Sequence, residues 1–128
     1  MNATIVLAVA LGGAVGAPLR MFIDGRVTGW VDQQRWSTRT SMFPWGLLAV
    51  NALGALVIGI SFGAFEGVLR TLIATGVCGA LTTYSAYALV IHRLWRENRA
   101  VAWASVIVMP VVCISLCSAA VLITRALV

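Results

Sequence analysis

Four long apolar runs divide this chain of 128 residues, and each is close to the length that crosses a bilayer as a helix. A membrane-spanning helix needs about 20 apolar residues, and the runs cover residues 3–23, 43–65, 69–91 and 100–124. Because lipid offers no hydrogen-bond partners to the backbone, each run is expected to be helical. We therefore predict an all-α integral membrane protein, with residues 1–128 forming a single membrane domain of four transmembrane helices.

Composition argues against an ordinary soluble domain. Apolar residues make up 61% of the chain and charged residues only 10%, whereas about 25% charge is usual in soluble proteins. The net charge of +5 could indicate nucleic acid, but most of the arginines lie in polar segments that flank the apolar runs. Membrane flanks explain this placement better than a phosphate-binding face. We expect the lipid bilayer, and no nucleic acid, as the surroundings of the chain.

The sequence offers no candidate catalytic site. No nucleophile–base pair or metal-ligand set is recognisable, and Cys78, Cys113 and Cys117 lie inside apolar runs without metal-ligand spacing to His92. The spans also carry no well-embedded acidic residue, since Glu66 sits at a helix end. We therefore predict that the chain is not an enzyme, and a proton-coupled exporter is disfavoured.

Small residues recur at intervals that bring one helix face close to another. The pairs Gly12/Gly16 and Gly59/Gly63, with Gly67 as the next member, form GxxxG patterns. In membranes such spacing lets backbones approach closely where no hydrophobic effect drives association. The pattern predicts tight helix packing and says nothing of function.

Polar residues at bilayer depth are the candidates for function. Asn51, in the second span, is either a hydrogen-bond clamp between helices or a pathway residue. Arg20, at the end of the first apolar run, has an interfacial anchor as its default interpretation. In the third span, residues 76–87 place two glycines before Thr82 and Thr83. This segment is either a break whose freed backbone groups bind an ion, or a bent helix with Thr hydroxyls bonded to earlier carbonyls.

Two aromatic residues follow the threonines at a spacing that places them on one helix face. Tyr84 and Tyr87 are three residues apart. Aromatic residues in membrane helices usually serve packing or the interface, but an aromatic edge carries positive quadrupole character. Such edges could offer weak contacts to a small anion in a narrow passage.

Three motifs in this order resemble the Fluc/CrcB family of fluoride channels. Residues 12–20 (GGAVGAPLR) resemble its GGxxGAxxR first helix, and residues 43–54 (FPWGLLAVNALG) resemble its PxGTLxxNxxG second helix. Residues 76–87 (GVCGALTTYSAY) are similar to its GxxGGxTTFSTF segment. The resemblance extends over nearly the whole chain.

The resemblance implies an antiparallel dimer with a break in helix 3 and two fluoride pathways lined by both subunits. The implied function is a fluoride-selective channel subunit in the bacterial inner membrane. It would export fluoride passively, lower its cytoplasmic concentration and give fluoride resistance. A structural sodium ion at the dimer interface is the implied cofactor.

Individual positions take roles from the same resemblance. The implied fluoride-pathway residues are Asn51, Thr83, Tyr84, Ser85, Tyr87 and Arg20. The implied sodium ligands are the backbone carbonyls of Gly79 and Thr82.

Several positions depart from the family pattern. Tyrosine replaces both pore phenylalanines, Leu47 replaces a threonine, and alanine stands at positions 80, 86 and 88 where the family has glycine or hydroxyl residues. The fourth span contains Pro110 and offers Ser105, Ser115 and Ser118 as polar positions, without a clear correspondence to those of the family. These differences favour an alternative function, a weakly conducting or non-conducting partner subunit in a heterodimer with an oppositely oriented paralogue.

Arginine placement gives an independent indication of orientation. The first and third connections share one side of a four-span chain and hold Arg20, Arg26, Arg35, Arg39, Arg93, Arg96 and Arg99. The other side holds only Arg70 and Arg125. Because positive loops stay in the cytoplasm, a single orientation with both termini outside is predicted. Homodimer and heterodimer both remain open.

Overall fold

The computed structural model describes residues 2–33 and 42–128, and this part of the chain is helical nearly throughout. It contains four segments long and apolar enough to cross a membrane, which confirms the predicted number of spans for these residues. The third span consists of several joined helices. The helices are α1 (Ala3–Gln33), α3 (Trp45–Ala64), α4 (Gly67–Arg70), the π-helix η1 (Thr71–Val77), α5 (Cys78–Leu81), α6 (Tyr84–Glu97) and α7 (Arg99–Leu127).

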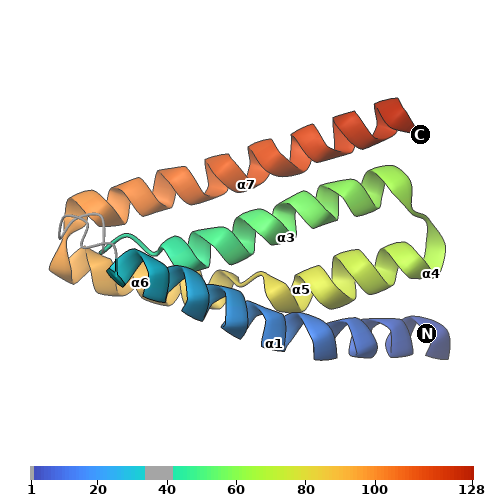
Figure 1. Ribbon diagram of the computed structural model, residues 1–128, viewed down its shortest axis with the longest axis horizontal. Helices are drawn as coiled ribbons and strands as arrows, with labels where there is room; N and C mark the ends of the chain where they lie inside the picture. The colour runs from blue at the N-terminus through green and yellow to red at the C-terminus, as the bar shows by residue number, and fades with distance from the viewer. Residues whose placement is uncertain (1, 34–41) are drawn as a thin grey trace.

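The four spans run side by side along one axis (Figure 1). Helix α3 packs most extensively against α7, while α1 packs against α3, η1 and α5. Both termini lie at the same end of the bundle as α4, and the corner between α6 and α7 lies at the opposite end (Figure 1). Successive spans are therefore antiparallel, as short connections between them require.

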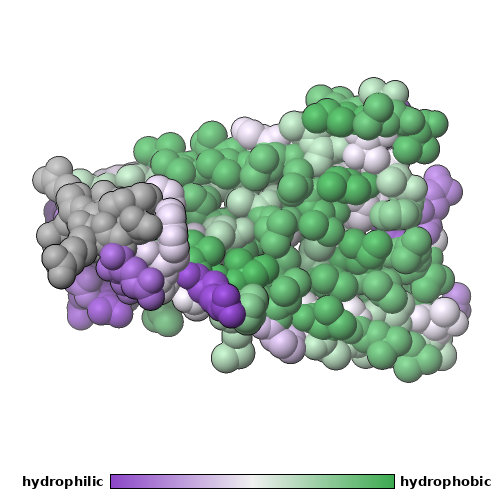
Figure 2. Space-filling view, viewed as in Figure 1, coloured by the Kyte–Doolittle hydropathy of each residue, from purple (hydrophilic) through white to green (hydrophobic). Residues whose placement is uncertain are grey.

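Apolar residues cover most of the face shown in Figure 2, and hydrophilic residues gather mainly at one end of it. That end carries the C-terminal part of α1 and the corner between α6 and α7, where Arg26, Arg93, Arg96 and Arg99 lie along the chain. Arg35 and Arg39 lie outside the described residues. Large exposed side chains such as Leu11 on α1 and Ile114 on α7 suit contact with lipid or with another apolar surface.

Two helices are longer than the hydropathy pattern predicts. Helix α1 continues to Gln33 instead of ending near residue 23. Hydropathy detects only the apolar part of a helix, and the last third of α1 is polar. At about 1.5 Å per residue α1 exceeds the roughly 30 Å hydrocarbon layer, so its end projects beyond the bilayer. Helix α6 continues to Glu97 instead of ending near residue 91.

The corner between α6 and α7 is a single non-helical residue, Asn98. Its backbone N–H donates to the Leu94 carbonyl at 2.7 Å. Its side-chain Oδ1 accepts from the backbone N–H groups of Ala100 and Val101 at 3.1 and 3.3 Å. Asn98 therefore closes one helix and caps the next, which satisfies backbone groups that helix ends otherwise leave free.

Four of the five glycines in the GxxxG patterns lie at helix contacts. A Cβ atom on Gly12 would meet the Leu72 carbonyl of η1 at 2.5 Å, and one on Gly59 would meet the Cys117 carbonyl of α7 at 2.5 Å. Gly16 and Gly63 lie equally close to η1 and α7. Gly67 is different, since it begins α4 with a φ of 60°, a backbone conformation that glycine adopts most readily. It serves the turn between spans and not their packing.

The third span is bent at Thr82 and Thr83. Helix α5 ends at Leu81 and α6 begins at Tyr84, while Thr82 and Thr83 have extended backbone with ψ of 157° and 125°. The Thr82 hydroxyl also bonds back to the Cys78 carbonyl at 2.9 Å, as the bent-helix interpretation expects. The two halves remain joined in one membrane-length segment, Gly67–Glu97.

Candidate functional site

Asn51 of α3 is hydrogen-bonded to the backbone at the bend of the third span. The Thr83 N–H donates to Asn51 Oδ1 at 2.9 Å, and Asn51 Nδ2 makes a longer contact of 3.5 Å with the Thr83 carbonyl. Asn51 is therefore a clamp between two spans, one of the two roles that the sequence left open. The clamp does not exclude the other role, because Asn51 also lines a groove.

The hydrogen bond from Thr83 fixes the orientation of the Asn51 amide. A backbone N–H can only donate, so the side-chain atom facing it must be the acceptor Oδ1. The donor Nδ2 is then placed on the other side of the amide plane. One N–H of Nδ2 points toward the Thr83 carbonyl, and the second is available to the groove.

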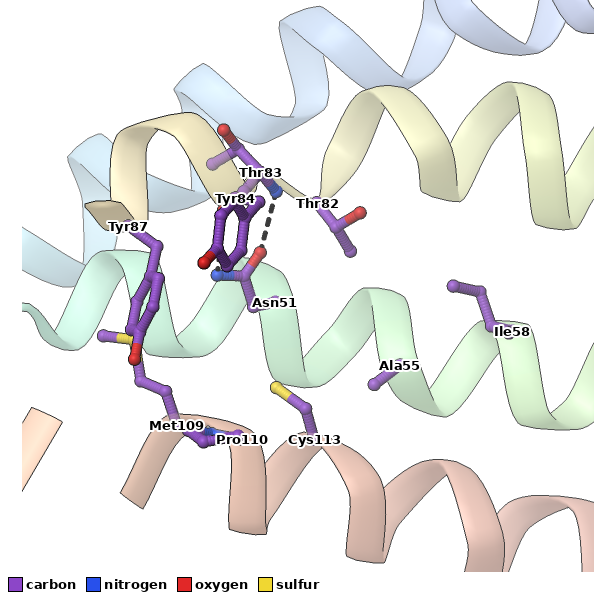
Figure 3. Close-up of a pocket in the computed structure, with 10 residues that line it drawn as sticks. All are labelled: Asn51, Ala55, Ile58, Thr82, Thr83, Tyr84, Tyr87, Met109, Pro110 and Cys113. Carbon is purple, nitrogen blue, oxygen red and sulfur yellow. Dashed lines mark hydrogen bonds between the residues drawn. The ribbon is translucent and has the colours of Figure 1, made fainter. Parts of the chain in front are cut away.

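The groove lies beside the bend, between α3, the start of α6 and α7 (Figure 3). It has a volume of about 470 Å³. It is open on one side, since Tyr84 at its edge is 81% exposed. None of its lining residues is charged: Asn51, Ala55, Ile58, Thr82, Thr83, Tyr84, Tyr87, Met109, Pro110 and Cys113.

A second hollow of about 460 Å³ adjoins the groove at the two tyrosines. Tyr84 and Tyr87 line both spaces, and their ring centroids are 5.7 Å apart with the planes tilted by 41°. The second hollow continues toward the arginine-rich end, where His92 and Trp95 line it. Together the two spaces form a track that passes the tyrosine pair.

Thr83 and Ser85 shape the start of α6. The Thr83 hydroxyl accepts from the Ala86 N–H at 3.3 Å, which caps this helix. It also lies 3.2 Å from the Ser85 hydroxyl, and either can donate. Ser85 itself is exposed and is not among the residues that line the groove.

Of the remaining predicted site residues, Thr82 lines the groove, while Arg20 and Gly79 do not. Arg20 is half-buried on α1 and lines neither hollow. Gly79 is exposed, and a Cβ atom built on it would meet nothing within 4 Å. Thr82 is half-buried, with its methyl group against Gly54 of α3.

Helix α7 supplies a wall that sequence reasoning did not identify. Met109, Pro110 and Cys113 line the groove opposite the bend (Figure 3). Ser105, a polar residue of the same span, is fully buried and donates to the Val101 carbonyl at 2.8 Å. The one available signal was Pro110, since a proline inside an apolar span marks an irregular helix.

The site suits a small anion better than a cation or a chemical reaction. The Thr82 and Thr83 hydroxyls that line the groove bond within their own segment. The other polar lining groups are the Asn51 amide and the hydroxyls of Tyr84 and Tyr87, all of which can donate hydrogen bonds. Among the residues that the structure describes, none that lines the groove is a carboxylate, and the remaining walls are apolar. An anion that loses water here would meet donors arranged along an otherwise dry surface.

Comparison with known proteins places nearly the whole chain in one family. A family model described as "CrcB-like protein, Camphor Resistance (CrcB)" matches residues 7–123. The matched residues extend into all four spans and contain the bend and the residues that line the groove.

Individual relatives agree with this match. A fluoride-specific ion channel FluC of Hahella chejuensis is 36% identical over 134 aligned residues, which cover 98% of each chain. A fluoride-specific ion channel FluC of Erythrobacter litoralis is 42% identical over 90 residues, covering 65% of this chain and 63% of the relative. The fluoride-specific ion channel FluC 1 of Streptomyces avermitilis is 43% identical over 99 residues, which cover 73% of this chain and 71% of the relative.

Proposed function

Because the chain belongs to the CrcB-like family, we propose that it is a subunit of a fluoride channel through which fluoride leaves the cell passively. The relatives named as fluoride-specific channels support this function. The observation that carries it is the orientation of Asn51, whose amide N–H faces an uncharged groove at the bend of the third span. Passive passage of an ion makes and breaks no covalent bond, so the chain is not proposed as an enzyme.

Fluoride would move along the track by exchanging water for protein donors. Its hydration is strong, so a selective pathway must replace that hydration contact by contact. In this chain the Asn51 amide and the hydroxyls of Tyr84 and Tyr87 can supply these contacts one after another. The tyrosine hydroxyls would add donors to the edge contacts expected from aromatic rings.

A second subunit would complete the pathway. The groove is open on one side, and Tyr84 is exposed there. In a bilayer such an opening would face lipid, which cannot solvate an ion. An antiparallel partner over this face would enclose the groove and place the two bends near one another. We propose this dimer, with the bend of the third span acting as an interruption at mid-membrane, in a bacterial inner membrane.

A sodium ion would fit the exposed side of the bend. Thr83 gives its N–H to Asn51, although in a continuous α-helix the same N–H would donate to the Gly79 carbonyl. The Gly79 carbonyl is thus relieved of its usual partner on an exposed, side-chain-free surface. Such an oxygen suits a hard cation. We propose Gly79 and Thr82 as sodium ligands that would join two subunits through their carbonyls.

Reconstitution of the purified chain in liposomes tests the function. We expect fluoride efflux, read with a fluoride electrode after a potassium gradient is shunted by valinomycin, and no comparable chloride efflux. Liposomes without protein provide the baseline. If the chain released chloride as readily as fluoride, or released fluoride only with a proton gradient, the channel proposal would be wrong.

The distribution of arginines favours a second candidate function, a partner subunit that conducts weakly or not at all. Seven of the nine arginines belong to one side of the predicted topology. A chain that forms antiparallel homodimers must insert in both orientations, which requires nearly balanced flanks. The bias therefore favours one orientation and a heterodimer with an inverted paralogue.

Orientation can be measured directly with single cysteines in a variant whose native cysteines are removed. Cysteines at Asn2 and at Val128 are labelled in intact cells with a membrane-impermeant maleimide. We expect nearly complete labelling at both positions, because both termini lie at the end away from the arginine-rich corner. Labelling of about half of the molecules would indicate dual insertion and favour the homodimer.

A further inference from the structure

We propose that Asn51 is a positioning residue for the cation as well as a donor to the groove, because it holds the Gly79 carbonyl free. This inference depends on the proposed function, since it assumes the sodium ion described there. It adds a role for a residue of the second span in a site built from the third. One side-chain amide would then serve ions on two faces of the same bend.

The hydrogen bonds around the bend show how the carbonyl becomes free. The last regular bond of α5 runs from the Thr82 N–H to the Cys78 carbonyl at 2.9 Å. The next N–H along the chain is that of Thr83, and the helical pattern would send it to the Gly79 carbonyl. It donates instead to Asn51 Oδ1 at 2.9 Å, a partner 32 residues away in sequence.

The neighbouring side chains do not replace the lost bond. The Thr82 hydroxyl is directed back to the Cys78 carbonyl at 2.9 Å. The Thr83 hydroxyl is engaged with the Ala86 N–H and the Ser85 hydroxyl. Gly79 has no side chain, and its surroundings are open. Gly79 is thus an exposed residue whose carbonyl has lost its helical partner and is not covered by a side chain of its own, and at bilayer depth a cation or a partner would have to satisfy it.

The acceptor atom of residue 51, and not its donor, is what the cation site requires. A side chain with an acceptor at this place keeps the Thr83 N–H away from Gly79. A side chain without one releases that N–H, which then returns to the Gly79 carbonyl or remains unpaired at a cost. Asn51→Asp retains an acceptor, whereas Asn51→Leu removes it in a side chain of similar size.

The experiment measures thermal unfolding of the purified protein in detergent, with sodium titrated against N-methylglucamine. For the unaltered protein we expect saturating sodium to raise the midpoint by about 5 °C. Asn51→Leu is expected to reduce this rise to less than about 1 °C. Asn51→Asp is expected to keep the rise and to reach it at an equal or lower sodium concentration, because a carboxylate is the stronger acceptor and adds negative charge nearby.

Ser61→Ala is the matched control for general destabilisation. Ser61 is fully buried on the same helix as Asn51 and donates to the Ile58 carbonyl at 2.8 Å. Loss of the Ser61 hydroxyl is expected to lower the midpoint of thermal unfolding by the same amount with and without sodium. A sodium-dependent rise that survives in Asn51→Leu would overturn the inference. If Asn51→Leu does not fold, a weaker sodium response in Asn51→Asp would also overturn it.

Fluoride efflux from the same samples separates this inference from the proposed function. Efflux by the unaltered protein without any sodium-dependent stabilisation would remove the cation role and leave the channel intact. A sodium response without fluoride efflux would support the cation role and contradict the channel function.

Discussion

Asn51→Asp is expected to lower fluoride efflux by about 100-fold while the protein remains folded. The carboxylate still accepts the Thr83 N–H that Asn51 accepts at 2.9 Å, so the bend keeps its shorter hydrogen bond and loses only the 3.5 Å contact from Nδ2 to the Thr83 carbonyl. On the groove side, however, a donor to fluoride becomes a negatively charged acceptor. Loss of a hydrogen bond to a charged group costs about 1.5–3 kcal/mol, and about 1.4 kcal/mol corresponds to a tenfold change. Efflux rates per protein in liposomes measure the effect.

Asn98→Asp is the matched control for this substitution. Asn98 lies at the corner between α6 and α7, does not line either hollow, and caps α7 through its Oδ1. Aspartate caps helices as well as asparagine does. We expect efflux within about twofold of the unaltered protein, since Asn98 is only half-buried and lies at the corner, away from the two hollows. If Asn51→Asp left fluoride efflux unchanged, the Asn51 amide would not be a donor in the fluoride pathway.

Gly12→Ala is expected to destabilise the bundle by about 2 kcal/mol or more. The added Cβ would lie 2.5 Å from the Leu72 carbonyl oxygen and 2.7 Å from both the Gly76 Cα and the Val77 N. All three atoms belong to the backbone of the third span, so no side chain can turn aside to relieve the contact. Helices α1 and η1 must separate instead. Chemical unfolding in mixed micelles measures the loss.

The adjacent glycine provides the comparison. A Cβ on Gly13 would meet nothing within 4 Å, and alanine is favoured over glycine within a helix by up to about 1 kcal/mol. Gly13→Ala is therefore expected to be neutral or slightly stabilising. Equal losses in the two variants would show that the separation of α1 from η1 is not the cause.

Hydropathy predicted the number and type of the spans because the bilayer imposes a single length scale on every crossing helix. It did not predict where α1 ends, since the polar residues up to Gln33 form helix outside the layer that hydropathy detects. The GxxxG patterns predicted four close contacts correctly. The prediction for Gly67 was wrong, because spacing alone cannot distinguish a packing glycine from one that adopts positive φ in a turn.

The third span was only partly predictable. The pair Thr82-Thr83 indicated the position of the bend, and its extended backbone lies there. The π-helix Thr71–Val77 had no sequence signal. It lies where Gly12 and Gly16 of α1 contact the backbone of the third span, so its geometry is tied to packing between distant segments. π-Helical turns inside α-helices often occur at functional sites.

Asn51 shows why a site can be named from sequence and still lack its mechanism. A polar residue inside an apolar span pointed to a clamp or to a pathway. Which atom of the Asn51 amide accepts and which is left to donate is decided by the Thr83 N–H, which is 32 residues away in the sequence. The groove wall from α7 was missed because Met109 and Cys113 are ordinary apolar residues whose position depends on helix packing. The antiparallel dimer and its sodium ion stay predictions.

The single-residue corner at Asn98 has a consequence for the width of the track. Trp95 of α6 and Trp103 of α7 contact each other with ring centroids 5.3 Å apart. Leu94, Val101 and Ala102 form a buried cluster beside them. The two helices that border the second hollow are thus braced on either side of the corner and cannot spread without breaking this cluster. The spacing of α6 and α7 at this end of the second hollow is therefore held by packed side chains on both sides of Asn98.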